Sequence, residues 1–217
     1  MNNSLDLILN SRLVAIIRLD DLTCAVPLAR ALLHGGIVAQ EFTLTNPRAL
    51  AAVSDVLSEL AAFSNGQATI GVGSVRSGDQ AERAIRSGAQ FVVSPIHSSD
   101  VTAACRSAGV PAMSGAMTPT EIATAWNDGA SIVKVFPARG LGPDYIRDVL
   151  APMPEIPLMP TGGIGLENMQ AYFEAGAVAA GVGGQLIDSA AIAAADWDRV
   201  ANTARAYTLR AARTPLQ

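Results

Sequence analysis

Lysine is almost absent from this sequence. Of its 217 residues, 15 are Lys or Arg, and Lys134 is the one lysine among them. It stands in the apolar run Ser-Ile-Val-Lys-Val-Phe, where an ammonium group is costly to bury. Its position therefore needs an explanation from structure or from chemistry.

Charge is scarce as well. Charged residues make up 16% of the chain, the formal net charge is −4, and no basic run occurs, which argues against nucleic acid as a partner. The start, Met-Asn-Asn-Ser-Leu-Asp, lacks the pattern of a signal peptide, and no apolar stretch reaches membrane-spanning length. We expect a cytoplasmic protein that does not contact a membrane.

Cysteine and histidine are also few. Cys24 and Cys105 fall in separate predicted helices, which indicates two reduced, buried thiols. No His, Cys and Asp cluster has the spacing of a metal site, so we expect neither a metal nor a cofactor. His34 ends a predicted helix, while His97 follows a strand, and its role stays open between packing and substrate contact.

One unit recurs along the chain: a helical segment ends in glycine, and a short β-branched strand follows. Gly88, Gly109 and Gly129 lie 21 and 20 residues apart, and each suits the left-handed residue that ends a helix. Asn46-Pro47, Thr118 to Glu121 and Gly142-Pro143 look like helix starts. Strands are predicted near residues 14–18, 38–44, 69–73, 90–94, 110–114, 131–136, 157–161 and 178–183, with a long last helix from about 190 to 211.

Eight strands that alternate with helices imply a parallel sheet with right-handed crossovers. Eight is the number that closes a (β/α)8 TIM barrel, and no linker interrupts residues 1–217. We therefore expect a single α/β barrel domain, with a doubly wound open sheet as the alternative.

Strand alternation predicts where Lys134 points. Side chains alternate between the two faces, so Ile132, Lys134 and Phe136 share one face, which in a barrel is the interior. The second strand places Glu41 on its inward face in the same way. Burial favours the neutral amine, which is able to attack a ketone and form a Schiff base. A purely structural Lys–Glu pair is the alternative.

Further candidates gather where the strands end. Gly71 and Gly73 leave volume for a ligand, Ser74 offers a hydroxyl, and Arg18 ends the first strand. Glycine pairs follow the seventh and eighth strands, where barrels commonly bind phosphate. These pairs are Gly162-Gly163 and Gly183-Gly184.

The stretches "QEFTLTNP", "GVGSV", "AQFVVSP", "MTPTE", "IVKVFPA" and "PTGGI" follow one another as in one enzyme family. Over roughly residues 12–210 the chain resembles the class I 2-keto-3-deoxy-6-phosphogluconate aldolases. That family includes the 2-dehydro-3-deoxy-6-phosphogalactonate and the 4-hydroxy-2-oxoglutarate aldolases.

The resemblance implies a homotrimer of (β/α)8 barrels that cleaves a 2-keto-3-deoxy-6-phospho sugar acid to pyruvate and glyceraldehyde 3-phosphate without a metal. Lys134 matches the family's Schiff-base lysine and Glu41 its general acid/base. The other implied contacts are Arg18 and Ser74 for the carboxylate, Pro95 for the wall around the pyruvate methyl, Thr161 near C2, and Gly162, Gly163, Gly183 and Gly184 for the phosphate.

Two departures leave the substrate open. Thr45-Asn46-Pro47 replaces the Arg-Thr of the gluconate branch, and Gln185 follows the second glycine pair where relatives often have a small polar residue. The choice between the two C4 epimers and the need for a phosphate therefore stay undecided. The other functions considered are a phosphate-binding barrel isomerase or synthase and a non-catalytic barrel that binds a sugar acid.

Overall fold

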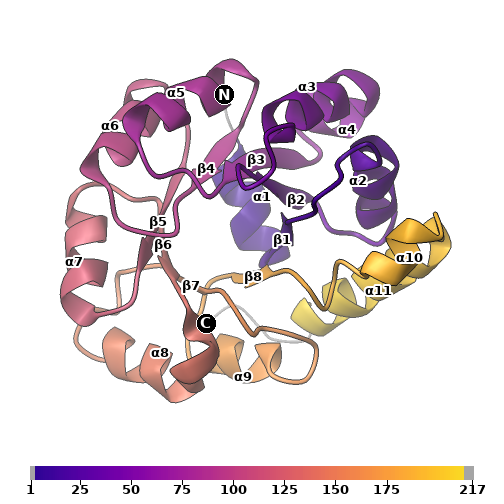
Figure 1. The fold of residues 1–217 in the computed structure, drawn as a ribbon. Coiled ribbons are helices and arrows are strands. Elements are labelled where there is room, and N and C mark those ends of the chain that lie inside the picture. Colours follow the sequence, from indigo (N-terminus) through magenta and orange to yellow (C-terminus); the bar gives the residue numbers. More distant parts are fainter. Residues whose placement is uncertain (1–2, 213–217) are drawn as a thin grey trace.

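A computed structural model of the protein describes residues 3–212 and contains a barrel of eight parallel strands surrounded by helices (Figure 1). From β1 to β7 each strand pairs with the next in sequence, and β1 also pairs with β8. A bridge between Thr161 and Gly181 joins the two sheet edges, β7 and β8. The closed order confirms the predicted (β/α)8 architecture and rules out the open sheet. The strands are β1 Leu13–Ile17, β2 Ala39–Thr43, β3 Thr69–Gly73, β4 Phe91–Val93, β5 Ala112–Ala116, β6 Ile132–Val135, β7 Leu158–Pro160 and β8 Ala180–Val182.

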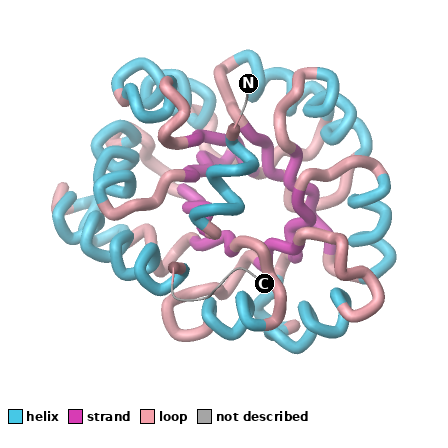
Figure 2. The backbone as a smooth tube through the Cα atoms, turned by 180° about the vertical axis from the view of Figure 1, so that it is seen from behind, coloured by secondary structure: helices cyan, strands magenta, loops and turns pink. Residues whose placement is uncertain are grey.

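Helices follow each strand and pack on the outer face of the barrel (Figure 2). They are α2 Ala25–His34, α3 Ala49–Glu59, α4 Ala61–Ser64, α5 Gly78–Arg86, α6 Ser99–Ser107, α7 Pro119–Asn127, α8 Gly142–Leu150, α9 Met169–Glu174, α10 Ser189–Ala193 and α11 Trp197–Ala211, with the short 3-10 helix η1 at Ala138–Gly140. No helix in residues 3–212 combines the length and apolar character that a membrane span requires.

An additional helix, α1 (Ser4–Ser11), precedes β1 and covers the amino-terminal end of the barrel (Figure 2). Ile8 packs with the inward side chains of the strands, and the Thr69 hydroxyl donates to the Ser4 hydroxyl at 2.7 Å. The barrel is therefore filled and sealed at this end, which leaves the carboxyl ends of the strands for a site.

Helix boundaries follow the predicted signals in most places. Gly88, Gly109 and Gly129 have φ values of 98°, 65° and 97°, as a left-handed helix end requires. Thr118 and Glu121 form a capping box at the start of α7, and Gly142 opens α8.

Two predicted boundaries are wrong. The predicted N-cap at Asn46 lies two residues early, since α3 has its N-cap at Arg48. The Asn46 amide instead donates to the Leu19 and Asp20 carbonyls at 3.0 and 2.8 Å and ties the β1 and β2 loops together. The predicted last helix is two helices, because Ala195 has a φ of 52° and Asp196 caps α11 by accepting from the Arg199 N–H at 3.0 Å.

The two faces of the strands bury different sets of side chains. Val133 and Val135 belong to the layer between strands and helices, whereas Ile132 packs inside the barrel. Other inward members of the same interior cluster are Val14, Ala39, Phe91, Val93, Met113 and Met159. This alternation, predicted for β6, therefore holds around the barrel.

Three glycines leave space inside the barrel that other parts of the chain fill. A Cβ at Gly71 would lie 2.4 Å from the Phe91 ring, and one at Gly73 would lie 1.6 Å from Glu41 Oε1. The prediction that these glycines leave volume for a ligand is therefore wrong, because protein side chains occupy that volume. At Gly115 a Cβ would lie 2.2 Å from the Pro95 carbonyl carbon, so the loop after β4 crosses directly over β5.

Gly115→Ala should lower the free energy of unfolding by about 1–3 kcal/mol, because the methyl group collides with the Pro95 and Ile96 backbone. Urea denaturation measures this loss. Gly140→Ala is the matched control, since nothing lies within 4 Å of its Cβ position, and it should change stability by at most about 0.5 kcal/mol. Equal effects of both substitutions would contradict the close approach at Gly115.

Candidate active site

Lys134 and Glu41 both point into the barrel, from β6 and β2. Lys134 is 5% exposed and Glu41 is 1% exposed. In the sheet, Lys134 is paired with Gly115 on β5 and Glu41 is paired with Gly71 on β3. Neither glycine places a side chain next to these groups. Within residues 3–212, Lys134 and Glu41 do not form an ion pair. Each nevertheless shifts the pKa of the other through its charge. The two groups thus face a common interior without touching.

Burial shifts both groups toward their neutral forms. Desolvation lowers the pKa of Lys134, and the nearby Glu41 raises it while Arg18 lowers it further. Desolvation likewise raises the pKa of Glu41, against the opposite effects of Lys134 and Arg18. Glu41 Oε2 has no hydrogen-bond partner in the described part of the chain, so that oxygen is free to exchange a proton with a ligand.

The aromatic ring of Phe136 lines the same space. Lys134 Nζ lies 5.2 Å from the Phe136 centroid, and the ring borders the adjoining cavity. An apolar wall beside the amine excludes water, which favours the uncharged and nucleophilic form.

A cavity of about 560 Å³ lies at the carboxyl ends of the strands; Phe136 borders it, whereas the buried Lys134 and Glu41 are not among its lining residues. Its volume falls in the range of small-molecule sites. The loops after β1, β6, β7 and β8 form its walls. The lining residues are Ile16, Arg18, Leu19, Phe136, Arg139, Thr161, Gly162, Gly163, Ile164, Gly181, Gly183, Gly184, Gln185, Ile187 and Ser189.

The predicted residues on the β1, β7 and β8 side meet at this cavity. Arg18 is exposed at the end of β1, and the two predicted glycine pairs line the same cavity. Gly162 and Gly163 have φ values of 93° and 82°, a conformation that directs backbone N–H groups outward from a tight turn.

Thr161 lies at the floor of the cavity. It is 3% exposed, and its hydroxyl oxygen has no hydrogen-bond partner among the described residues. A Cβ at Gly181 would lie 2.3 Å from Thr161 Oγ1, so the glycine on β8 makes room for this hydroxyl. An unpaired buried hydroxyl at the edge of a cavity is suited to bind a polar group of a ligand.

Ser74 and Pro95 do not line this cavity. Ser74 directly follows β3 with a φ of 61°, and Pro95 lies over Gly115 of β5. Both sit on the β3–β5 side of the barrel mouth, away from the glycine pairs, and their substrate contacts stay predictions.

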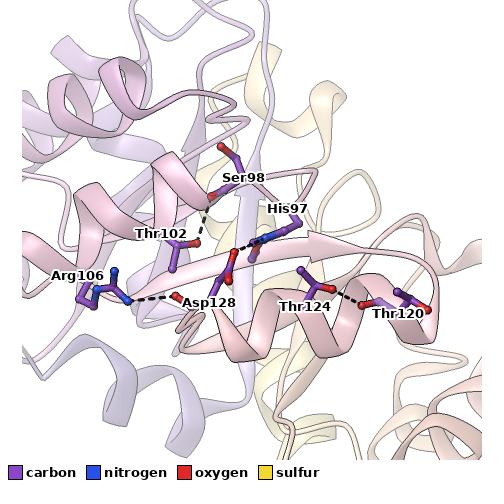
Figure 3. Close-up of polar contacts among 8 residues, drawn as sticks. His97, Ser98, Thr102, Arg106, Thr120, Thr124 and Asp128 are labelled. Atoms are coloured by element: carbon purple, nitrogen blue, oxygen red, sulfur yellow. Dashed lines mark hydrogen bonds and ion pairs between the residues drawn. The ribbon is translucent and has the colours of Figure 1, made fainter.

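His97 points toward Asp128 (Figure 3) and is not among the residues that line the cavity. Its Nδ1 lies 3.0 Å from Ser114 Oγ, and its Nε2 lies 2.8 Å from Asp128 Oδ2, at the end of α7. The structure therefore favours packing over substrate contact for His97: its hydrogen bonds tie the loop that carries Pro95 to the next βα unit.

The sequence interpretation missed Arg139 and Ser189, which also border the cavity. Arg139 belongs to η1, directly after β6, and a cation at the active-site end of a strand was the available signal. Gln185, which raised doubt about a phosphate, packs its amide against Gly165, whose Cβ would lie 1.7 Å from Gln185 Oε1. Within the described residues no group of three or more His, Cys, Asp or Glu side chains is placed to hold a metal ion.

Comparison with known proteins gives a consistent result. The family model "Aldolase: KDPG and KHG aldolase" matches residues 6–203. A 2-dehydro-3-deoxy-phosphogluconate aldolase of Treponema pallidum is 38% identical over 190 residues, covering 87% of this chain and 88% of that protein. A 2-dehydro-3-deoxy-6-phosphogalactonate aldolase of Escherichia coli is 31% identical over 160 residues, covering 72% of this chain and 75% of that protein.

Solved structures agree with the sequence relatives. A native KDPGal structure has a TM-score of 0.83 at 29% identity and covers 93% of this chain and 94% of its own. The KDPG aldolase of Legionella pneumophila, with pyruvate captured as a covalent carbinolamine intermediate, has a TM-score of 0.83 at 26% identity, covering 94% and 97%.

The family model extends over nearly the whole barrel, including β1 to β8 and every residue that borders the cavity. The resemblance predicted from the six sequence stretches is therefore confirmed, and so is the expectation of a carbon–carbon lyase. This chain belongs to the KDPG and KHG aldolase family, the Schiff-base aldolases built on a (β/α)8 barrel.

Proposed function

We propose that this aldolase reversibly cleaves a 2-keto-3-deoxy-6-phospho sugar acid to pyruvate and glyceraldehyde 3-phosphate, with Lys134 as the Schiff-base residue and Glu41 as the general acid/base. The observation that carries the proposal is the burial of the chain's one lysine inside the barrel, close to a buried carboxyl group. Relatives named for both the gluconate and the galactonate substrate support this substrate class.

The first half of the reaction builds the imine. The neutral Lys134 amine attacks the C2 ketone and gives a carbinolamine, which loses water to form a protonated imine. Glu41 supplies the proton that the departing hydroxyl needs and takes up the proton that the amine releases. Its raised pKa keeps the proton available at the carboxyl group for this exchange.

The second half breaks the carbon–carbon bond. Glu41 removes the C4 hydroxyl proton, directly or through a water molecule, and the C3–C4 electron pair moves into the imine to give an enamine and the free aldehyde. Protonation of the enamine at C3 gives the imine of pyruvate, and water hydrolyses it to restore the Lys134 amine. The positive imine nitrogen acts as the electron sink.

The remaining predicted residues hold the substrate at its two ends. Arg18 binds the carboxylate, aided by Ser74 or a neighbouring N–H, and its electrostatic effect on Lys134 supports a place close to C2. Thr161 contacts the substrate near C2, and Pro95 bounds the pyruvate methyl group. The N–H groups of the loops at Gly162-Gly163 and Gly183-Gly184 bind the phosphate.

Treatment with pyruvate and borohydride should add one reduced pyruvate to the wild-type chain at Lys134. Because the sequence has one lysine, mass spectrometry of the intact chain measures this modification directly, once any adduct at the amino terminus is subtracted. Lys134→Met, checked for folding by circular dichroism, is the matched control and should stay unmodified and inactive. An adduct of equal amount in Lys134→Met would contradict the proposal.

The pH dependence of imine trapping should reveal the two charges around Lys134. Trapping requires the neutral amine, so its rate should rise with pH through a midpoint below the usual 10.5 of lysine. Glu41→Gln removes a charge that favours the ammonium form and should move the midpoint to lower pH. Arg18→Met removes a charge that disfavours it and should move the midpoint to higher pH. Shifts of the same sign in both variants would be inconsistent with this electrostatic arrangement.

We further propose a cytoplasmic homotrimer. A structural neighbour with a TM-score of 0.82 is a cage designed by fusing symmetric oligomeric domains, which is in keeping with an oligomeric barrel. Ile96 and Met117, which are 51% and 44% exposed on the loops after β4 and β5, offer apolar surface for an interface.

Sedimentation equilibrium should give a mass three times that of the 22.4 kDa chain. The double substitution Ile96→Asp and Met117→Asp should lower that mass, because charges in an apolar interface oppose association. The exposed Leu209→Asp on α11 is the control and should keep the wild-type mass. A wild-type mass of one chain would exclude the trimer.

A further inference from the structure

Arg139 lies along the wall of the cavity that carries the first glycine pair. A Cβ placed on Gly163 would lie 2.9 Å from Arg139 Cβ, 3.1 Å from its Cγ and 3.1 Å from its Nε. The arginine stem therefore occupies the space that the missing side chain of Gly163 leaves. Arg139, Gly162 and Gly163 all line the same cavity.

Among the residues that the structure describes, the guanidinium of Arg139 has no acidic partner. The ion pairs within residues 3–212 join Arg86, Arg147, Arg199 and His97 to carboxylates, and Arg139 is in none of them. The residues that line the cavity include two arginines and no Asp or Glu. A cavity with this lining attracts anions, and a planar guanidinium is suited to bind phosphate oxygens in pairs.

The two arginines of the cavity are placed differently relative to the reactive amine. Arg18 is among the groups that act on Lys134 and Glu41, whereas Arg139 is not. Arg18 directly follows β1, whereas Arg139 lies on the loop after β6, beside Gly163. A substrate with a carboxylate next to its ketone and a phosphate at its other end matches this arrangement of two cations.

We infer that Arg139 is a specificity-determining residue that binds the distal phosphate of the substrate together with the loop at Gly162-Gly163. The inference rests on the proposed function and deepens it: the guanidinium adds a charged, two-pronged contact to the neutral backbone donors of the glycine loops. The enzyme consequently selects phosphorylated over unphosphorylated sugar acids through a contact remote from the reacting carbon atoms.

Retro-aldol kinetics on the phosphorylated sugar acid and on its unphosphorylated counterpart test the inference. Arg139→Ala should lower kcat/KM for the phosphorylated substrate about 10- to 100-fold, mainly through KM, because a charge-assisted contact is lost. The same substitution should change kcat/KM for the unphosphorylated acid less than about 2-fold. Arg139→Lys, which keeps the charge but not the fork, should fall between wild type and Arg139→Ala for the phosphorylated substrate.

Arg147→Ala is the matched control, since Arg147 is an exposed arginine of α8 that pairs with Asp144 outside the cavity. It should leave both substrates unaffected. Inorganic phosphate gives an independent measurement: it should inhibit cleavage of the unphosphorylated acid by wild type and inhibit Arg139→Ala at least 10-fold more weakly.

Equal losses on both substrates in Arg139→Ala, or no loss on the phosphorylated one, would overturn the assignment. A wild-type enzyme that has no preference for the phosphorylated acid would overturn it as well. The trapping experiment with pyruvate and borohydride tests the Schiff-base proposal separately, because the pyruvate adduct at Lys134 does not require a phosphate or Arg139.

Discussion

The burial of one primary amine is the constraint on which the rest of the structure depends. Lys134 lies inside a barrel whose amino-terminal half is filled with apolar side chains and covered by α1. Water therefore has access only from the carboxyl ends of the strands, where the cavity lies. The same burial that costs stability for a charged lysine makes its neutral form a nucleophile at moderate pH.

Glycines shape the space around that amine. Gly73 admits the Glu41 carboxyl group, Gly115 admits the loop that carries Pro95, and Gly181 admits the Thr161 hydroxyl. On three strands, a glycine thus leaves space where a side chain would stand. A functional group or a loop from a neighbouring strand or unit fills that space. The site is built from strands as much as from loops, which fixes the acid and the amine more rigidly than loops alone would.

Much of this arrangement was predictable from the sequence because strand geometry is periodic. The alternation of side chains was enough to direct Lys134 and Glu41 inward. The recurring helix-ending glycines marked several of the units, and the predicted strands gave the count of eight. The glycine pairs after β7 and β8 also fell where the fold places anion sites.

What local sequence does not determine is which neighbour fills a space. The sequence predicted that Gly71 and Gly73 leave space for a ligand. In the structure Phe91 and Glu41 occupy that space, and only tertiary packing determines which side chains do so. Asn46 read as a helix cap, but its amide bonds the β1 loop, a partner distant in sequence. Arg139 was missed for the same reason, because its importance comes from its contact with Gly163 of another loop.

The central claim, a neutral lysine inside the barrel, is tested most directly by nuclear magnetic resonance. In protein labelled with ¹³C-lysine, the one lysine gives a single side-chain signal, whose chemical shift at Cε reports the protonation of Nζ. The account predicts a titration midpoint below 10.5, the ordinary value for lysine. A midpoint at or above 10.5 would contradict it.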